Sequence, residues 1–557
     1  MKNDFSVFAK WDHYVVTFLD GDGTQFATQN VSAGEKAHVP EGEPTKVPSD
    51  GAVYRFARWE TSFDDPINSD ITIVPVFEKI TGVTATFFNG DGSVLDAVTV
   101  PLGGNAETSL TPTKQDDSNT VFTFTGWDKS TVGLMEDTSF YPQFSSAIDD
   151  TIFSYVETGD GTVSVTGFNS SWKSRMQKIT IPSELGGQTV EMIGDSAFAA
   201  KRITSLVMPD TITYIGVDSF FNCYFEEVHL STSLQSVGTR AFQSCGSLKS
   251  LDIPASLTVI ETDAFGGASA LTTLTLHEGL KTVKASAFSG CVNLTELALP
   301  STLEYVQDQA FYECGALTSL TIPSSVKTIG TRAFGQCRSL TEIHFPASTI
   351  NIGDYAFQGC GGVKTVFLPG SITEEQLVSL HSAFSWLSGV TSIKFDGEPK
   401  NMKFENGCLF STDGSVLLLY ARGSARVSYT MPEAVKRIAA YAFQNATNLK
   451  TIEFQPTGSL EFGERSFYGS GLTSLFIPSY VTEIPDYCFN ETDIKVSFIP
   501  SSVVTMGHRT LPETYKAKLF CEAASKPAGW ASDWFYGNPS YVVWGSTLSQ
   551  AEEALNA

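Results

Sequence analysis

Six of the nine cysteines occupy one repeated position, three residues after a phenylalanine. Thiols at regular intervals could form disulfides or hold a metal ion. The equivalent position elsewhere carries Ala268, Ala446 or Ser470, so it accepts any small side chain. No Cys-x-x-Cys pair occurs that would favour zinc. We therefore interpret the six as a column of buried, packed thiols: Cys223, Cys245, Cys291, Cys314, Cys337 and Cys360.

Two acidic segments have residue types that could bind calcium. They are Asp-Gly-Asp-Gly at Asp20–Gly23 and Asn-Gly-Asp-Gly at Asn89–Gly92. Neither continues into the twelve-residue loop with a distal glutamate that an EF-hand requires. Both lie between strand-like runs, where Asp-Gly favours a hairpin turn. We expect turns there and no metal ion.

The seven histidines are scattered, with no H-x-H or H-E-x-x-H pair, and no nucleophile-elbow, P-loop or dinucleotide glycine motif is present. We therefore predict no catalytic residue, no metal ligand and no cofactor, and so no enzyme. The formal net charge of -25 argues against nucleic-acid partners. No run of eighteen apolar residues occurs, which argues against direct insertion into a membrane.

A repeat of about 23 residues organises most of the chain. A small residue followed by phenylalanine recurs at intervals of 22 to 24 residues, apart from one of 27 and one of 59. A proline ends an L-x-I-P strand eleven residues before many of these rings. One such unit cannot bury its apolar groups, but stacked units can. The repeated residues are Phe198, Phe220, Phe242, Phe265, Phe288, Phe311, Phe334, Phe357, Phe384, Phe443, Phe467 and Phe489, followed by Leu511.

The fold that this pattern predicts is a β-rich leucine-rich-repeat solenoid of about thirteen coils of 22–24 residues. Asp413-Gly414, in the 59-residue interval, predicts a hairpin insertion near 400–430. The run from Val16 matches the run from Ala85, so small β-modules precede the solenoid. The predicted boundaries are 1–12, the closing strand of a truncated upstream repeat; 13–80 and 81–147, the two modules; 148–511, the solenoid; 512–545, a Trp-rich cap; and 546–557, a tail.

Residues on either side of the buried aliphatic residue in each solenoid strand should point outward. These outward positions are mostly short and polar, and they form the predicted ligand-binding surface. The aromatic members, Phe367 and Phe476, are the expected anchors, because aromatic residues dominate interface energetics. The selected residues are Glu227, His229, Asp252, Glu296, Glu342, His344, Phe367, Lys394 and Phe476.

The unit that combines I-P, I-G and A-F-x-x-C resembles the BspA-like leucine-rich repeats of bacterial surface proteins. The N-terminal modules resemble the Listeria–Bacteroides (internalin B-type) repeat, a small β-grasp-like module whose closing strand ends like Ala9-Lys10-Trp11. The tail, with its FCEA, SKPAGW and VVWG segments, is similar to the endings of such proteins in Gram-positive bacteria. These resemblances imply extracellular display and adhesion, with no defined ligand.

The leading hypothesis is a non-catalytic bacterial cell-surface adhesin or protein-interaction scaffold. Its solenoid would bind a host or microbial protein or glycan, and its modules would act as a spacer. The alternatives are an accessory binding region of a larger secreted enzyme, a phage host-recognition protein, and a structural component of a surface layer. We expect an extracellular or cell-surface location, although the first residues show no secretory signal. The chain is expected to be a fragment of a longer repeat array.

Overall fold

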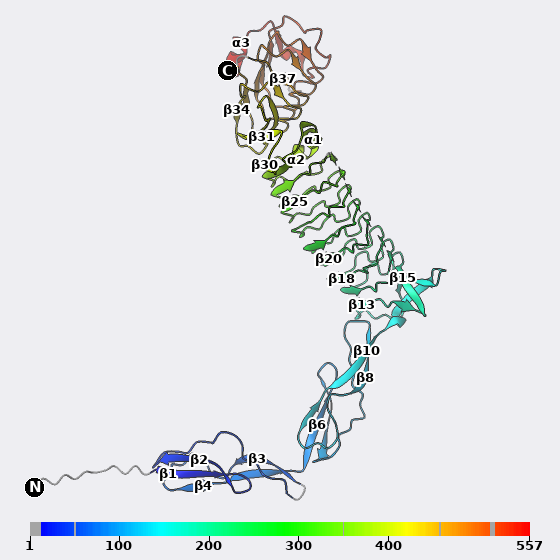
Figure 1. Ribbon diagram of the computed structural model, residues 1–557, viewed down its shortest axis with the longest axis vertical. Coiled ribbons are helices and arrows are strands. Elements are labelled where there is room, and N and C mark those ends of the chain that lie inside the picture. Colours follow the sequence, from blue (N-terminus) through cyan, green and yellow to red (C-terminus); the bar gives the residue numbers. More distant parts are fainter. Residues whose placement is uncertain (1–12, 50–51, 349, 456–457, 513–517, 557) are drawn as a thin grey trace, which may run out of the picture. The chain divides into compact units, whose positions relative to one another are not determined.

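The computed structural model describes residues 13–49, 52–348, 350–455, 458–512 and 518–556. The contacts within the chain form two units (Figure 1). One contains Met1–Asp116 and Thr120–Asp149, and the other contains Asp117–Asn119 and Asp150–Ala557. The closing strand predicted at 1–12 lies outside the described residues.

The first unit contains two modules with the same strand topology. In each module one long strand pairs antiparallel with the next strand and parallel with a short later strand, and a separate antiparallel pair completes the module. The first module has β1 (His13–Leu19), β2 (Gln25–Ser32), β3 (Val53–Trp59), β4 (Ile71–Ile73) and β5 (Pro75–Ile80); the second has β6 (Gly82–Phe88), β7 (Val94–Pro101), β8 (Thr120–Trp127), β9 (Thr138–Phe140) and β10 (Pro142–Ile148). The structure thus supports the internal repeat that the sequence predicts.

Each module is built around aromatic residues at equivalent places. Phe18 meets Trp59 with ring centroids 5.1 Å apart, and Phe87 meets Trp127 at 4.8 Å. The two Asp-Gly segments connect β1 to β2 and β6 to β7 as turns, as predicted. In the first turn, the backbone N–H and hydroxyl of Thr24 both donate to the Asp22 carboxylate, which lowers the pKa of Asp22.

Two faces of the solenoid carry parallel sheets, and most coils contribute a short strand to each face (Figure 1). We call the sheet built from the L-x-I-P strands the first sheet. Its strands are β13 (Lys178–Thr180), β16 (Ser205–Val207), β18 (Glu227–His229), β20 (Ser250–Asp252), β22 (Thr273–Thr275), β25 (Ser319–Thr321), β27 (Glu342–His344), β29 (Thr365–Pro369), β30 (Ser392–Asp396), β34 (Ser428–Thr430), β36 (Thr451–Glu453), β38 (Ser474–Phe476), β40 (Val496–Ile499), β42 (Lys518–Cys521) and β43 (Val542–Trp544).

The second sheet is built mainly from two-residue strands at the I-G segment of each coil. Its strands are β11 (Phe153–Glu157), β12 (Thr162–Phe168), β14 (Glu184–Leu185), β15 (Gln188–Ile193), β17 (Tyr214–Ile215), β19 (Ser236–Val237), β21 (Val259–Ile260), β23 (Thr282–Val283), β24 (Tyr305–Val306), β26 (Thr328–Ile329), β28 (Asn351–Ile352), β33 (Val416–Tyr420), β35 (Arg437–Ile438), β37 (Glu461–Phe462), β39 (Glu483–Ile484) and β41 (Thr505–Met506). A short 3-10 turn, η1 (Asp150–Ile152), precedes β11.

The repeated phenylalanines form a stacked column inside the solenoid. From Phe198 to Phe357, consecutive rings lie nearly parallel with centroids 5.0 to 5.8 Å apart. These rings are fully buried. The residue two positions before the ring has a left-handed backbone in coil after coil, for example Gln309 with φ 57° and Arg332 with φ 54°. This left-handed residue turns the chain so that the next two side chains enter the core.

All nine cysteines are buried and free. Along the column each thiol donates to the backbone carbonyl of the ladder phenylalanine one coil earlier, as from Cys223 to Phe198 at 3.1 Å and from Cys360 to Phe334 at 3.1 Å. Burial raises the pKa of the Cys291 thiol to about 12. The predicted column of packed thiols is therefore confirmed.

The 59-residue interval contains an additional coil. Strand β32 (Cys408–Ser411) pairs antiparallel with β33 across Asp413-Gly414, which is the predicted hairpin, and β32 also pairs antiparallel with β31 (Met402–Glu405). However, β33 also pairs parallel with β35, and it places Tyr420 in the column, 5.0 Å from Phe443. Tyr420 lies 23 residues before Phe443, so in this additional coil, which the sequence pattern did not predict, a tyrosine takes the place of the usual ladder phenylalanine.

Two short helices interrupt the column just before this hairpin. They are α1 (Glu374–Ser379) and α2 (His381–Trp386), and α2 carries the buried Phe384. Helix α1 begins at a capping box in which Thr373 and Gln376 bond to each other's backbone N–H groups. Its Glu374 forms a two-pronged ion pair with Arg437, at 2.7 and 2.8 Å.

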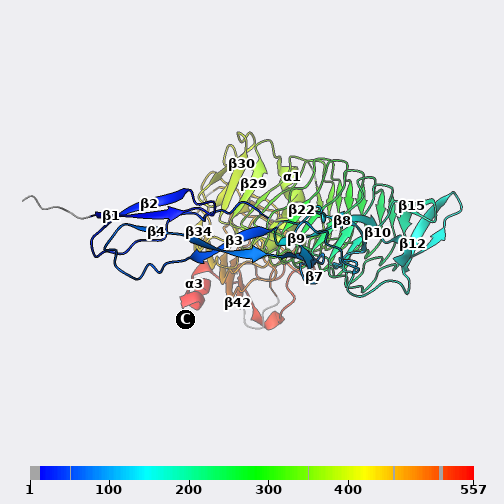
Figure 2. The same cartoon turned by 90° about the horizontal axis from the view of Figure 1, so that it is seen from below.

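The last coils end in a cap built around tryptophan. Trp530 and Trp534 are buried with ring centroids 4.7 Å apart, and Trp530 donates to the Val503 carbonyl at 2.9 Å. Strands β42 and β43 extend the first sheet, with the 3-10 turn η2 (Pro539–Tyr541) between them. Helix α3 (Leu548–Asn556) then lies beside β42 (Figure 2).

Candidate ligand-binding surface

The outer face of the first sheet holds most of the residues that the sequence selected. In β18, β20, β22 and β25 the central residue is buried and the two flanking residues are exposed. Parallel pairing in register then aligns the flanking residues of successive coils into two columns. Glu227 belongs to one column and His229 to the other.

In the early coils the selected residues lie on different coils rather than around one point. Glu227 accepts a hydrogen bond from the Ser205 hydroxyl at 3.0 Å. The Asp252 carboxylate contacts Nε2 of His277 at 2.7 Å. Glu296 is exposed on a segment that is not one of the named strands. These residues form a polar surface, but they do not converge on one site.

The later coils bring three of the selected residues together. In the register of β27, β29 and β30, His344 aligns with Phe367, and Phe367 with Lys394. The His344 and Phe367 rings stack with centroids 4.0 Å apart and an interplanar angle of 6°. Lys394 Nζ lies 5.5 Å from the Phe367 centroid, and His344 Nδ1 is 2.9 Å from Asp396 Oδ2. We call these four residues the His344 cluster.

Asp396 is the member of the cluster that sequence reasoning missed. Most strands of the first sheet have three residues, whereas β29 and β30 have five. Because β30 continues to Asp396, two residues after Lys394, both side chains lie on the same face of the sheet. Glu342 starts the other column of this region and pairs with Thr365 of β29.

Phe476 does not stand free on this face, contrary to the prediction. It packs against an apolar cluster formed by Val496, Phe498, Phe520 and Ala551, and Ala551 is a fully buried residue of α3. In the last coils Phe476, Phe498 and Phe520 align in one outward column, and α3 packs against this apolar column. The expected aromatic anchor at Phe476 is therefore part of the packing of the C-terminal helix.

The hairpin forms a pocket beside β34 that the sequence did not indicate. The pocket has a volume of about 460 Å³. The Arg426 guanidinium donates to the Asn406 carbonyl, in the turn between β31 and β32, at 2.7 Å. The pocket lining includes Lys403, Glu405, Phe410, Arg426, and the outward residues Ser428 and Thr430 of β34.

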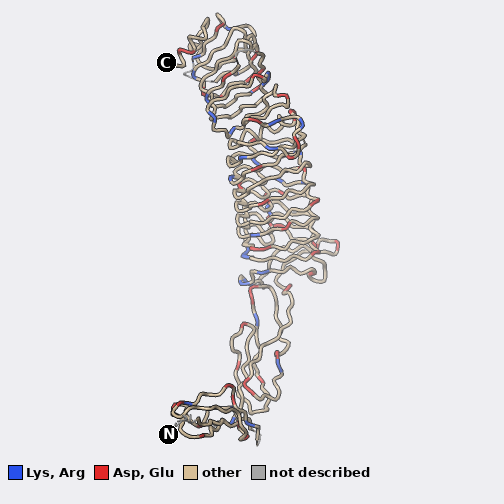
Figure 3. The backbone as a smooth tube through the Cα atoms, turned by 60° about the vertical axis from the view of Figure 1, so that its left-hand side comes forward, with Lys and Arg blue, Asp and Glu red and all other residues tan. Residues whose placement is uncertain are grey.

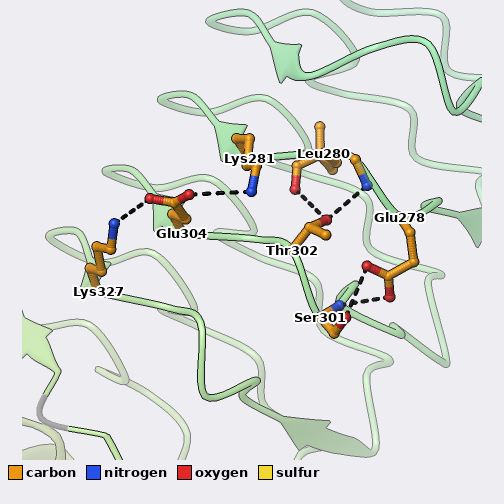
Figure 4. A network of polar contacts seen from close by, with 8 residues as sticks. Glu278, Leu280, Lys281, Ser301, Thr302, Glu304 and Lys327 are labelled. Carbon is orange, nitrogen blue, oxygen red and sulfur yellow. Dashed lines mark hydrogen bonds and ion pairs between the residues drawn. The ribbon is translucent and has the colours of Figure 1, made fainter.

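The polar residues on the turns between the two sheets are engaged by neighbouring coils (Figure 4). The Glu278 carboxylate accepts from the backbone and hydroxyl of Ser301, at 2.9 and 3.0 Å. Glu304 lies between Lys281 and Lys327, and contacts with both lysines lower the pKa of Glu304. These contacts stabilise the stack, so we place the ligand surface elsewhere.

Acidic and basic residues are interspersed along the coils (Figure 3). Among the described residues, no three His, Cys, Asp or Glu side chains gather as metal ligands would. The same described residues contain no helix that is long and apolar enough to cross a membrane.

Residues 191–317, 304–414 and 422–522, more than half of the chain, match the BspA type leucine rich repeat region in six copies. No curated protein matches the chain. A solved leucine-rich repeat protein from Bacteroides ovatus is similar at 22% identity and a TM-score of 0.37, covering 64% of this chain and 95% of that one. A leucine rich cell surface protein from Faecalibacterium prausnitzii has 19% identity, a TM-score of 0.32, and coverage of 72% and 96%. The pneumococcal vaccine antigen PcpA has 17% identity, a TM-score of 0.30, and coverage of 72% and 94%.

Proposed function

We propose, because the chain belongs to the BspA type leucine-rich repeat family, that it is a scaffold displayed outside the cell. In this proposal the outer face of the first sheet binds an extracellular protein or glycan, and the chain acts as an adhesin or interaction protein. The repeat supplies a rigid surface, and variable outward residues supply specificity. The proposal assigns no catalytic step to the chain.

The His344 cluster is the observation that carries this proposal. The aromatic ring of Phe367 lies between His344 and Lys394. The Asp396 carboxylate contacts Nδ1 of His344 and so fixes the orientation of the imidazole. Stacked aromatic groups with charged neighbours are typical of the few residues that dominate binding energy. The side chains also restrain one another, which lowers the entropy lost on binding.

The N-terminal modules have a separate role in this proposal. Their shared topology and aromatic centres support a tandem of small β-domains. We assign them to the Listeria–Bacteroides repeat type and give them the role of a spacer that carries the solenoid.

A binding screen of the full chain against extracellular-matrix proteins and a glycan array tests the proposal. For any ligand found, changing both Phe367→Ala and Lys394→Ala should weaken binding at least about tenfold. Thr275→Ala is the matched control, because Thr275 is exposed on the same column of outward residues, and its change should leave affinity unaltered. Full affinity in the double variant, or binding carried by the N-terminal modules alone, would contradict the proposal.

A further inference from the structure

A second surface, formed by turns rather than by the first sheet, has the features of a binding groove. Its volume is about 640 Å³, and residues from Asp354 to Arg509 line it. We call it the Tyr–Arg groove after the residues that the argument uses: Tyr355, Trp386, Tyr441, Arg465, Tyr487 and Arg509.

Five of these six residues occupy the left-handed position that precedes the ladder ring in each coil. Their φ angles are 63° for Tyr355 and Tyr441, 54° for Arg465, 55° for Tyr487 and 46° for Arg509. A side chain in this conformation costs roughly 1–2 kcal/mol relative to glycine. Earlier coils place serine, aspartate, glutamine or arginine at the same position, for example Ser196, Asp218 and Arg240, and no aromatic residue. The tyrosines are therefore what distinguishes this position in the later coils, although the backbone does not need them.

The side chains of the groove provide aromatic ring faces and hydrogen-bond donors. The rings of Tyr355 and Trp386 lie 4.8 Å apart. The guanidinium of Arg465 lies over the Tyr487 ring at 4.7 Å and reaches the Tyr441 hydroxyl at 3.4 Å. Tyrosine and arginine thus alternate from coil to coil, and each cation restrains a ring.

The backbone N–H groups of the lining residues are not available to pair with a peptide. They already bond to carbonyls of the next coil, as from Tyr441 to Glu464, from Asn445 to Tyr468 and from Tyr487 to His508, at 2.9 to 3.1 Å. A ligand must therefore be recognised by side chains. Pyranose rings suit such a surface, because their C–H faces pack on aromatic rings while their hydroxyls bond to amides and guanidinium groups.

The charge of the groove favours a neutral ligand. Arg465 and Arg509 are balanced by Asp354 and Glu491 in the lining, whereas the whole chain has a net charge of -25. Asn445 and Asn490 add amide groups to the lining. A highly charged ligand would meet both signs of charge, but a sugar hydroxyl can donate to the carboxylates and accept from the arginines.

We propose that the Tyr–Arg groove binds a neutral oligosaccharide that lies along the stack of coils. Neighbouring strands of a sheet are about 4.8 Å apart, so each coil would offer its ring or guanidinium at intervals close to the length of one sugar residue. This site is separate from the His344 cluster, and the inference does not require the proposed function to be correct.

Calorimetric titration of the full chain with maltohexaose, cellohexaose, chitohexaose and mannohexaose tests the inference. At least one should bind with a Kd between about 10 μM and 1 mM. Trp386→Ala and Tyr487→Ala should each weaken that binding at least tenfold while the thermal unfolding midpoint stays close to that of the parent. Tyr224→Ala is the matched control, since Tyr224 is exposed and faces Arg202 at 5.7 Å in an early coil.

Phe367→Ala should also leave the oligosaccharide affinity unchanged, which separates this site from the His344 cluster. The inference is overturned if none of the four probes binds, or if binding survives both groove substitutions. It is equally overturned if only an acidic probe, oligogalacturonate, binds.

Discussion

Arg422 is the most unusual side chain of the solenoid, because the fold buries its positive charge. It is only 4% exposed. Its Nη2 donates to the Tyr441 carbonyl at 3.3 Å, while Nε and Nη1 have no hydrogen-bond partner among the described residues. Burial lowers the pKa of Arg422 far below its usual range, to about 9. A buried charge with so little compensation costs free energy of folding.

Replacing Arg422 by an apolar side chain of similar length should therefore stabilise the protein. We expect Arg422→Met to raise the free energy of unfolding by about 1–4 kcal/mol, measured by urea denaturation at pH 7. Arg338→Met is the control, because Arg338 is exposed on an earlier coil of the same solenoid. A less stable Arg422→Met variant would show that the guanidinium is paired in solution.

The same residue predicts a pH dependence. The folded-state pKa of Arg422, about 9, lies below its unfolded value, so in the pH window that begins near 9 the unfolded chain binds the proton more tightly. The destabilising effect is therefore fully present below pH 9 and declines as the pH rises through that window. The stability difference between Arg422→Met and the parent should shrink between pH 8 and pH 10. A constant difference would contradict this assignment.

The thiols should be inert in the folded protein. All nine are buried, and burial raises the pKa of Cys223 and Cys488 to about 12, so almost no thiolate is present at neutral pH. In a DTNB assay at pH 8 we expect no rapid reaction from the native chain and nine equivalents in denaturant. Rapid modification of the native protein would show that the coils open readily.

At the scale of the element, Tyr420 tests whether one ring per coil is the structural requirement. It is 1% exposed and stacks on Phe443. Tyr420→Ala should lower the free energy of unfolding by about 3–5 kcal/mol. Tyr420→Phe should change it by less than about 1 kcal/mol, because phenylalanine is the usual ladder residue. Equal losses in the two variants, measured by urea denaturation, would show that the hydroxyl matters instead of the ring.

Regular spacing explains why the coils could be predicted and why some details could not. A phenylalanine marks the buried core position in nearly every repeat. The outward positions of β27, β29 and β30 follow because side chains alternate between the two faces of a strand. Tyr420 was not predicted as a ladder residue because it is a tyrosine and because the hairpin insertion interrupts the 23-residue spacing before it. The burial of Phe476 depends on α3, a segment outside the repeat. The Tyr–Arg groove depends on left-handed residues whose directions no repeat pattern reveals.

At the scale of the whole molecule, each end of the first sheet leaves an edge that needs a partner. At the start, Asp117–Asn119 belongs to the solenoid unit and pairs with the segment around β13. The Asn119 side chain accepts from the backbone N–H of Thr180 at 2.9 Å and donates to the Thr180 carbonyl at 3.0 Å. Unpaired edge strands favour fraying or association with another chain.

Removing this amide should loosen the first coil and leave the others intact. We expect Asn119→Ala to speed amide hydrogen exchange in peptides that span Gln177–Thr180, with a loss of about 1–3 kcal/mol in local opening free energy. Peptides around β25 are the internal control and should exchange as before. Faster exchange along the whole solenoid would mean that the edge nucleates the entire stack.

The hydrogen bonds of each coil's turns, such as those joining Phe311 to Ala333 and Phe334 to Ala356, connect it to the adjacent coil. Tension along the axis of the solenoid is therefore carried mainly from each coil to its neighbour. A force applied to its two ends should remove coils one at a time, beginning at an end. Each event would release about 23 residues, or roughly 75 Å of extended chain. The solenoid would then behave as an extensible tether that dissipates mechanical work in small, repeated steps.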